Sequence, residues 1–586
     1  MPTDSLQGQE WQSDVIVDLI KQFEFPHITL NPGASYRGLH DSLVNYGNND
    51  PAMILCQHEK IAVQIAHGYA KTTGTPMVAI VHNVVGLLHA TLAIYYAYLD
   101  RAPIFVVGAT GPMDEGKRRP FLDWIHTANV QGEQVRNYVK WDYQPTSIDG
   151  VADSFARAYS IMMTEPRGPV YMCYDAWLQE MPLEAPVALP DPNCARVPTA
   201  IAPDPRAIEE AAGRLVSATS PVLLAEYVAR APHGFDDLVE LAETTGAVVF
   251  DVASRLNFPS EHPLNGSMDG EVFRTADLIV ALDVQDWERP THKTNGTLRT
   301  KEQLYPDSCT WVEIGFNDLN ISKWSMDYQR FPDCAQKILA DTLLAIPALT
   351  AACKKLIAAD PAIAKRIAQR KTAVETHRKT VRAGWRDQAN KKLEGTPIQL
   401  PRLALDVWDA IKDEDWVLTA GTLDTWARKL WNFDRAYRTP GRALGTATQI
   451  GISLGVALAH KGSGRLVVDL QPDGDLMFDA GALWTAARYE IPMLIVMHNN
   501  RAYYNDWDHQ ISVARHRGTP LERTNIGMDI VEPPPDFAGL ARSMGWYAEG
   551  PIERPEDVPA ALQRAIAVVK TGKPALIDTI TRRRHE

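Results

Sequence analysis

Cysteine is scarce in this sequence, and the close cysteine pairs that are typical of zinc sites are missing. The 586 residues include six cysteines, at positions 56, 173, 194, 309, 334 and 353. We interpret them as reduced thiols of a cytosolic protein. The sequence also lacks a run of about 18 consecutive apolar residues, and its polar, acidic first residues contain no hydrophobic segment of a signal peptide. These absences predict a soluble, cytoplasmic protein without a membrane partner.

An excess of positive charge is missing as well. The sequence has 59 Lys and Arg residues against 72 Asp and Glu residues, which gives a formal net charge of −13. This balance argues against a nucleic-acid partner. Apolar residues make up 45% of the chain and charged residues 22%, as in ordinary soluble proteins. The length predicts three or four domains, because one core does not grow to this size.

Short apolar strands alternate with helical segments along most of the chain. In residues 1–185 this alternation predicts a parallel sheet that is covered on both faces. A linker rich in Pro and Ala follows at 186–205, and the same rhythm returns in 206–350. A charged helical connection spans 351–396, and a last such block spans 397–586. We therefore predict the α/β fold class, with three doubly wound parallel-sheet domains.

The stretch from Arg465 to Asp506 carries the strongest functional signal. Its pattern predicts a strand, a loop, a helix, a second strand and a second loop. A right-handed crossover would make the two strands parallel and place Asp473 and Asn500, which are 27 positions apart, beyond the same carboxyl edge. Carboxylate and amide oxygens at such an edge suit Mg²⁺ that carries phosphate.

This arrangement resembles the signature of enzymes that depend on thiamine diphosphate (ThDP), a Gly-Asp-Gly followed by Asn-Asn. It stands here as Pro472-Asp473-Gly474 and Asn499-Asn500. The resemblance implies that Mg²⁺ is held by Asp473, the Asn500 side chain and the Ala502 carbonyl. It also implies that amides near Gly474 and Asp475 hold the diphosphate. Pro472 departs from the signature, because proline has no N–H and fixes φ.

The first 180 residues or so are similar to the pyrimidine-binding domain of the same superfamily. The similarity follows the order Asn31-Pro32-Gly33, then His58-Glu59, then a strand that ends at His82-Asn83. It implies that Glu59 activates the cofactor by a hydrogen bond to the aminopyrimidine ring. It also places His82 on the active-site histidine of benzoylformate decarboxylase-like enzymes. Cyclohexane-1,2-dione hydrolase has a histidine nearby too, and a histidine that only caps the loop is the structural alternative.

The resemblance implies further site residues. Substrate contact or proton transfer is implied for His126, and for Asp506 at the position where pyruvate decarboxylases carry a catalytic Glu; an exposed loop aspartate is the alternative for the latter. Contacts to the diphosphate are implied for Gly421, Thr422 and Leu423, and support of the bent cofactor for Thr448 or Ile450. The middle block resembles a domain that binds FAD in some members, but Glu226-Tyr227-Val228-Ala229 follows its first strand without a glycine cluster. FAD is therefore not expected.

The resulting hypothesis is a lyase that uses ThDP and Mg²⁺ to cleave a carbon–carbon bond of a small molecule. The C2 carbanion of the cofactor would add to a 2-oxo acid or a related 2-hydroxy or 2-oxo compound, most simply for non-oxidative decarboxylation. Three alternatives stay open: acetolactate synthase-like carboligation, ring cleavage of a cyclic 1,2-diketone, and a non-catalytic ThDP-binding regulatory subunit. The superfamily also implies a homodimer or homotetramer with the cofactor at the subunit interface.

Overall fold

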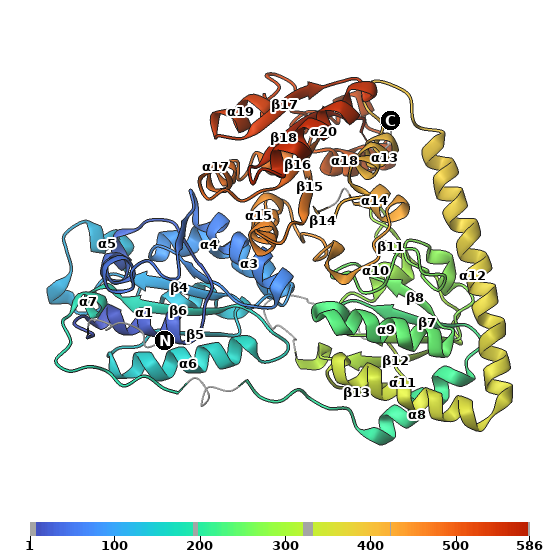
Figure 1. Cartoon of the computed structure of the whole chain (residues 1–586), viewed down its shortest axis with the longest axis horizontal. Helices are drawn as coiled ribbons and strands as arrows, with labels where there is room; N and C mark the ends of the chain where they lie inside the picture. Colours follow the sequence, from blue (N-terminus) through green and yellow to red (C-terminus); the bar gives the residue numbers. More distant parts are fainter. Residues whose placement is uncertain (1–7, 192–196, 320–331, 422–423, 584–586) are drawn as a thin grey trace.

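Three parallel sheets, each covered by helices, make up the chain. The computed structural model describes residues 8–191, 197–319, 332–421 and 424–583. Figure 1 shows the N-terminal sheet on one side, the middle sheet beside it and the C-terminal sheet above them. The predicted α/β fold class with three doubly wound domains is confirmed.

The N-terminal sheet has the strand order β2-β1-β3-β4-β6-β5, and all its pairings are parallel. Helices cover both faces of this sheet, and the residues of β1, β3, β4 and β6 are therefore buried on both sides. The strands are β1 Ile28–Leu30, β2 Met53–Leu55, β3 Val78–Ile80, β4 Phe105–Thr110, β5 Trp141–Tyr143 and β6 Val170–Asp175. The helices are α1 Gln12–Gln22, α2 Arg37–Asp41, α3 Glu59–Thr73, α4 Val84–Leu99, α5 Leu122–His126, α6 Asp149–Met163 and α7 Ala176–Glu180.

The middle sheet has the order β13-β12-β9-β7-β8 and is also parallel, with a separate hairpin of β10 and β11. One of its helices, α11, is long and apolar enough to cross a membrane, but it packs into the core of this domain with α8 and α9. The strands are β7 Pro221–Ala225, β8 Val248–Asp251, β9 Leu278–Leu282, β10 His292–Asn295, β11 Thr300–Gln303, β12 Thr310–Gly315 and β13 Gln336–Leu339. The helices are α8 Pro205–Ser217, α9 Pro232–Thr245, α10 Glu288–Thr291 and α11 Thr342–Ala359.

A helix of 30 residues, α12 Pro361–Asn390, runs from the middle domain up to the C-terminal domain (Figure 1). The parallel C-terminal sheet has the order β14-β15-β16-β18-β17. Its strands are β14 Trp416–Ala420, β15 Leu466–Pro472, β16 Leu494–Asn499, β17 Tyr547–Ile552 and β18 Ala575–Ile580. Its helices are α13 Leu400–Ile411, α14 Thr425–Leu430, α15 Gln449–His460, α16 Asp473–Leu476, α17 Gly481–Arg488, α18 Tyr504–Arg517, α19 Phe537–Ser543 and α20 Val558–Val569.

Helices α3 and α15 join the N-terminal and C-terminal domains within the one chain (Figure 1). They cross where each has a glycine: a Cβ on Gly68 would lie 2.0 Å from the Ile452 carbonyl oxygen, and a Cβ on Gly455 would lie 2.1 Å from the Ile65 carbonyl oxygen. The missing side chains therefore allow the two backbones to approach each other closely.

We expect the substitution Gly68→Ala to lower the thermal unfolding midpoint, because its methyl group would meet backbone atoms of α15. Overpacking of this kind costs about 1–3 kcal/mol, more than the roughly 1 kcal/mol that a helix gains when alanine replaces glycine. The matched control is Gly213→Ala in α8, where a Cβ would meet no atom within 4 Å. Calorimetric scans measure both midpoints. A Gly68→Ala midpoint that is equal to or above that of wild type, as is expected for the control, would contradict the close approach of α3 and α15.

Candidate active site

A cavity of about 380 Å³ lies at the carboxyl edge of the C-terminal sheet. Strand β15 pairs with β16 in parallel, and Pro472 lies opposite His498. Asp473 and Asn500 therefore follow the two strands at the same edge, as their spacing predicts, and both line the cavity.

Asp473, Asn500 and Ala502 meet at one point of this cavity. The Ala502 amide nitrogen lies 3.3 Å from Asp473 Oδ2 and 3.0 Å from Asn500 Oδ1. Asp473 is 2% exposed, and this burial raises the pKa of its carboxyl group to about 7. A nearby divalent cation would offset the cost of the buried charge. The oxygen atoms gathered here thus fit Mg²⁺ that carries a diphosphate.

The backbone next to Asp473 accommodates Pro472, which stands in place of the first glycine of the signature. Pro472 has a φ of −68°, which is the angle that its ring prefers. Gly474 lies against the ring of Tyr503, where a Cβ would be only 2.6 Å from Cε1. Asp475 accepts hydrogen bonds from the amides of Ala447, at 2.6 Å, and Gln449, at 3.3 Å. The Asp475 carboxylate therefore holds the loop before α15, which forms another wall of the cavity.

The residues predicted to support the bent cofactor do not line the cavity. Thr448 is buried, and its hydroxyl donates to the Gly445 carbonyl oxygen at 2.5 Å. Ile450 is buried in the core between the domains. The cavity wall in this segment includes Ala443, Leu444, Gly445 and Thr446, and support of the cofactor by Thr448 or Ile450 stays a prediction.

Gly421 follows β14 and lines the cavity, and its contact to the diphosphate stays a prediction. Its amide donates to Gln449 Oε1 at 2.8 Å. Thr422 and Leu423 lie outside the described residues. Asp506, in the first turn of α18, also lines the cavity, where it is exposed. The position of Asp506 is compatible with contact to a substrate, and its catalytic role stays a prediction.

Glu59 is the first residue of α3 and is 5% exposed. Its Oε2 lies 3.1 Å from His89 Nδ1, and the ring of His89 stacks on that of His58 at 4.6 Å. A Cβ on Gly86 would lie 2.8 Å from Glu59 Oε1, so a glycine makes room for this carboxylate. A negative charge is favoured here, because the amino end of a helix carries a partial positive charge.

His89 was not predicted as a partner of Glu59. Only the fold reveals the contact, because His89 lies in α4 and Glu59 begins α3. We expect His89→Leu to lower turnover about tenfold, since a hydrogen bond to a charged group contributes about 1.5–3 kcal/mol and partial exposure weakens it. His89→Asn, which can still donate, should recover part of this loss in steady-state kinetics. Equal rates for the two variants and wild type would show that His89 does not position Glu59.

His82 lies at the carboxyl edge of the N-terminal sheet, beside the other predicted histidine. Its Nδ1 is 2.9 Å from Ser35 Oγ, and its ring centre is 5.1 Å from that of His126. Burial, and then the neighbouring His126, lower the pKa of His82 from its ordinary value. Both effects favour the neutral ring. Among the residues that the structure describes, the buried His126 Nδ1 has no hydrogen-bond partner.

The N-terminal histidines and Glu59 form one group, which faces the C-terminal domain. Glu59 and His82 both pack against Gly86, where an added Cβ would lie 2.8 Å from Glu59 Oε1 and 2.9 Å from His82 Cβ. One residue after Glu59, Lys60 Nζ lies 2.9 Å from Asp479 Oδ1. Tyr96 of α4 lines the cavity. The two domains thus meet within a single chain, and the predicted assembly of the site across a subunit boundary stays a prediction.

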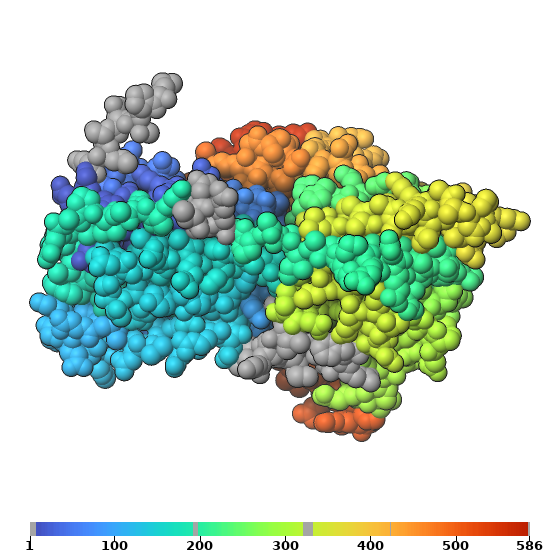
Figure 2. Space-filling view, turned by 90° about the horizontal axis from the view of Figure 1, so that it is seen from below, coloured from blue at the N-terminus to red at the C-terminus, as the bar shows by residue number. Residues whose placement is uncertain are grey.

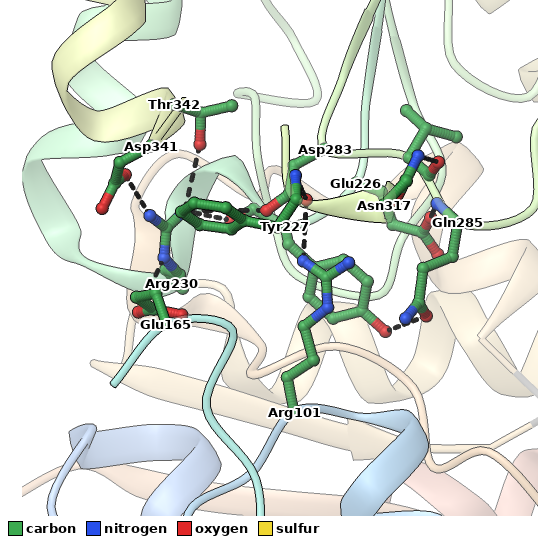
Figure 3. A network of polar contacts seen from close by, with 12 residues as sticks. Arg101, Glu165, Glu226, Tyr227, Arg230, Asp283, Gln285, Asn317, Asp341 and Thr342 are labelled. Carbon is green, nitrogen blue, oxygen red and sulfur yellow. Dashed lines mark hydrogen bonds and ion pairs between the residues drawn. The ribbon is translucent and has the colours of Figure 1, made fainter. Parts of the chain in front are cut away.

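The carboxyl edge of the middle sheet is occupied by side chains of the protein itself. Figure 3 shows Arg101 extending from the N-terminal domain to Asp283, which follows β9, with a distance of 2.7 Å between Nη1 and Oδ1. The preceding residue, Asp100, accepts from Arg255 of the middle domain at 2.7 Å. Glu226, which follows β7, accepts from the amide of Gln285 at 2.6 Å. A nucleotide in a doubly wound sheet would lie at this edge, and the expected absence of FAD stays a prediction.

Comparisons with known proteins agree with this geometry. The family profile "Thiamine pyrophosphate enzyme, N-terminal TPP binding domain" matches residues 11–131. The profile "Thiamine pyrophosphate enzyme, C-terminal TPP binding domain" matches residues 419–579.

Several relatives match nearly the whole chain. Benzoylformate decarboxylase of Pseudomonas aeruginosa is 24% identical over 90% of this chain and 91% of its own length. Acetolactate synthase 1 of Nicotiana tabacum is 22% identical over 97% of this chain and 81% of its own. The solved structure of a ThDP-dependent 4-hydroxybenzoylformate decarboxylase from Rhodococcus jostii RHA1 superimposes with a TM-score of 0.76 at 19% identity, and covers 98% of this chain and 100% of its own. That superposition shows a shared fold.

Proposed function

Because this chain belongs to the thiamine diphosphate-dependent enzyme superfamily, we propose that it is a lyase that cleaves a carbon–carbon bond of a 2-oxo acid or a related 2-hydroxy or 2-oxo compound. Non-oxidative decarboxylation is the reaction we favour. The observation that carries this proposal is the pair of imidazoles, His82 and His126, beside Glu59. Such a group can return a proton to the substrate carbon after the bond has broken.

The cofactor would be held by the residues described above. Asp473, Asn500 and the Ala502 carbonyl would bind Mg²⁺, and the backbone near Gly474 would bind the diphosphate. Glu59 would hold a hydrogen bond to a ring nitrogen of the pyrimidine. When bound, ThDP supplies a nucleophilic carbon and a positively charged ring that accepts the electrons of the broken bond.

His82 would move the proton. His82 would give the proton from its protonated form, in which Nδ1–H donates to Ser35 Oγ and Nε2 carries the second proton. Transfer of the Nε2 proton to the substrate carbon leaves the ring neutral. The half-buried His126 ring lies edge-on to His82 and restricts its orientation. Asp506 would act as a further proton donor or contact a polar group of the substrate at the cavity wall.

Carboligation is the second candidate, and the similarity to acetolactate synthase over nearly the full length favours it. The two functions differ in the reactant that meets the intermediate after cleavage, which is a proton in the first and a second carbonyl compound in the second. The test is a panel of 2-oxo acids, 2-hydroxyacyl thioesters and cyclic 1,2-diketones with ThDP and Mg²⁺, with and without an acceptor aldehyde, analysed by product mass.

Each result of this panel has a definite meaning. An aldehyde whose mass equals that of the 2-oxo acid less carbon dioxide supports decarboxylation. A product whose mass is the sum of the cleaved fragment and the acceptor supports carboligation. A ring-opened acid from a diketone would identify the third alternative. No product from any substrate, together with tight ThDP binding, would refute catalysis and leave a regulatory ThDP-binding subunit.

We infer that the enzyme forms a homodimer or homotetramer. Exposed apolar side chains support this inference: Leu88 on α4 is 58% exposed and Phe478 is 51% exposed. Surfaces of this kind are typical of protein interfaces. Light scattering after size-exclusion chromatography measures the mass directly, and a single chain mass at all concentrations would contradict the inference.

A further inference from the structure

A second cavity, of about 500 Å³, lies between α12 and the amino-terminal edge of the middle sheet. It is bordered by Pro221 at the start of β7, by Val248 at the start of β8 and by Thr275 just before β9. It is therefore at the opposite edge from the one that Arg101 occupies. In the space-filling view α12, in yellow, lies across the green middle domain (Figure 2). A cavity of this size is large enough for a small organic molecule.

Arg378 of α12 has a positively charged guanidinium group at this cavity that makes fewer hydrogen bonds than it can. Its side chain lines the cavity, yet the residue is only 5% exposed. Its Nη2 donates to the Ser260 carbonyl oxygen at 2.9 Å, whereas Nε and Nη1 are buried without a hydrogen-bond partner among the described residues. Leaving buried guanidinium donors unsatisfied is costly, so a ligand that accepts from them would be stabilised.

The other charged residues of the cavity leave an excess of positive charge. Arg366 also lines it, and its Nε is buried without a partner in the described part of the chain. Arg370 donates to main-chain carbonyl oxygens, among them that of Ala218 at 2.7 Å. The two acidic lining residues are already engaged: Asp269 lies 2.6 Å from His377 Nε2, and Glu271 lies 3.0 Å from Arg274 Nε. The unsatisfied donors therefore belong to Arg366 and Arg378.

Apolar side chains form the rest of the wall next to these donors, among them Val248, Val272, Ala373 and Val374. We propose that this cavity binds a small organic carboxylate, whose oxygens accept from Arg378 and whose apolar body packs against Val272 and Val374. Guanidinium and carboxylate match in charge and in the geometry of two parallel hydrogen bonds. Inorganic phosphate offers the charge without the apolar body.

Isothermal titration calorimetry of the protein loaded with ThDP and Mg²⁺ tests this proposal. The probes are hexanoate, hexylammonium with the same tail and the opposite charge, and inorganic phosphate. We expect hexanoate to bind with a defined stoichiometry, hexylammonium not to bind, and phosphate to bind more weakly than hexanoate. Absence of hexanoate binding would overturn the proposal, and phosphate binding as tight as that of hexanoate would overturn its apolar part.

Variants locate the site independently of turnover. Arg378→Met and Val374→Ser should each weaken hexanoate binding about tenfold or more, because the first removes the guanidinium donors and the second removes part of the apolar wall. The matched control is Arg382→Ala, because Arg382 donates to the same Ser260 carbonyl oxygen, at 2.9 Å, without lining the cavity. This variant should bind hexanoate as wild type does. Unchanged affinity in Val374→Ser, or in a folded Arg378→Met protein, would overturn the assignment.

Discussion

Replacement of Glu59 by glutamine is expected to lower turnover about a hundredfold or more, the range in which a positioned acid or base contributes to a rate. Glutamine has the same shape and should fit beside Gly86 as the glutamate does. It is neutral, however, and cannot hold the negative charge that favours the reactive form of the aminopyrimidine. The measurement is steady-state turnover, together with the rate at which the C2 proton of bound ThDP exchanges with deuterium.

Both readouts should fall together, while the affinity for ThDP and the thermal unfolding midpoint change little. The matched control is Glu115→Gln in the same domain, where the Glu115 side chain is 87% exposed and 3.9 Å from Arg118. This variant should turn over at the wild-type rate. A Glu59→Gln enzyme that exchanged the C2 proton as fast as wild type would refute the assigned role.

Replacement of Asp473 by asparagine is expected to weaken the binding of ThDP in the presence of Mg²⁺ at least about a hundredfold, because even the loss of an outer partner of a metal ligand costs about 10- to 100-fold. Asparagine keeps one oxygen ligand and the packing, but it loses the charge that attracts the cation. Titration calorimetry with ThDP at a fixed concentration of Mg²⁺ measures the effect.

The same substitution should not weaken the cofactor-free protein. Burial disfavours the charged form of Asp473, so a neutral amide in its place removes a desolvation cost. We therefore expect an unfolding midpoint equal to or above that of wild type without cofactor, and below it with ThDP and Mg²⁺. Asp409→Asn, at a carboxylate that is 67% exposed, serves as the control. A lower midpoint without cofactor would indicate a folding defect and not the loss of a ligand.

The sequence was sufficient to predict the elements that position Asp473 and Asn500. The apolar runs around Asp473 and Asn500 have strand length and are separated by one helix, so the crossover rule alone brings their ends together. Strand β15 ends directly before Asp473 and β16 directly before Asn500, so the two side chains lie at the predicted edge.

Other parts of the site depend on contacts that periodicity does not report. Thr448 faces the Gly445 carbonyl because the loop turns back at the start of α15, where Ala447 has a φ of +66°. That turn moves the cavity wall to Leu444, and no hydrophobic pattern indicates it. Tyr96 was missed for a different reason: it lies on an apolar helix whose whole surface has the composition of a core helix, so only packing against Gly445 distinguishes its role.

The adjacent residues Asp100 and Arg101 have a consequence for how the domains stay together. Asp100 forms an ion pair with Arg255, and Arg101 forms an ion pair with Asp283. Two adjacent residues of the N-terminal domain thus bind two residues of the middle domain through ion pairs of opposite polarity. Pulling the domains apart would take the carboxylate away from both Arg101 and Arg255, while Asp100 would keep Lys71, at 2.6 Å, within its own domain. The peptide linker is then not what keeps these domains docked, and a chain severed between them would remain one particle.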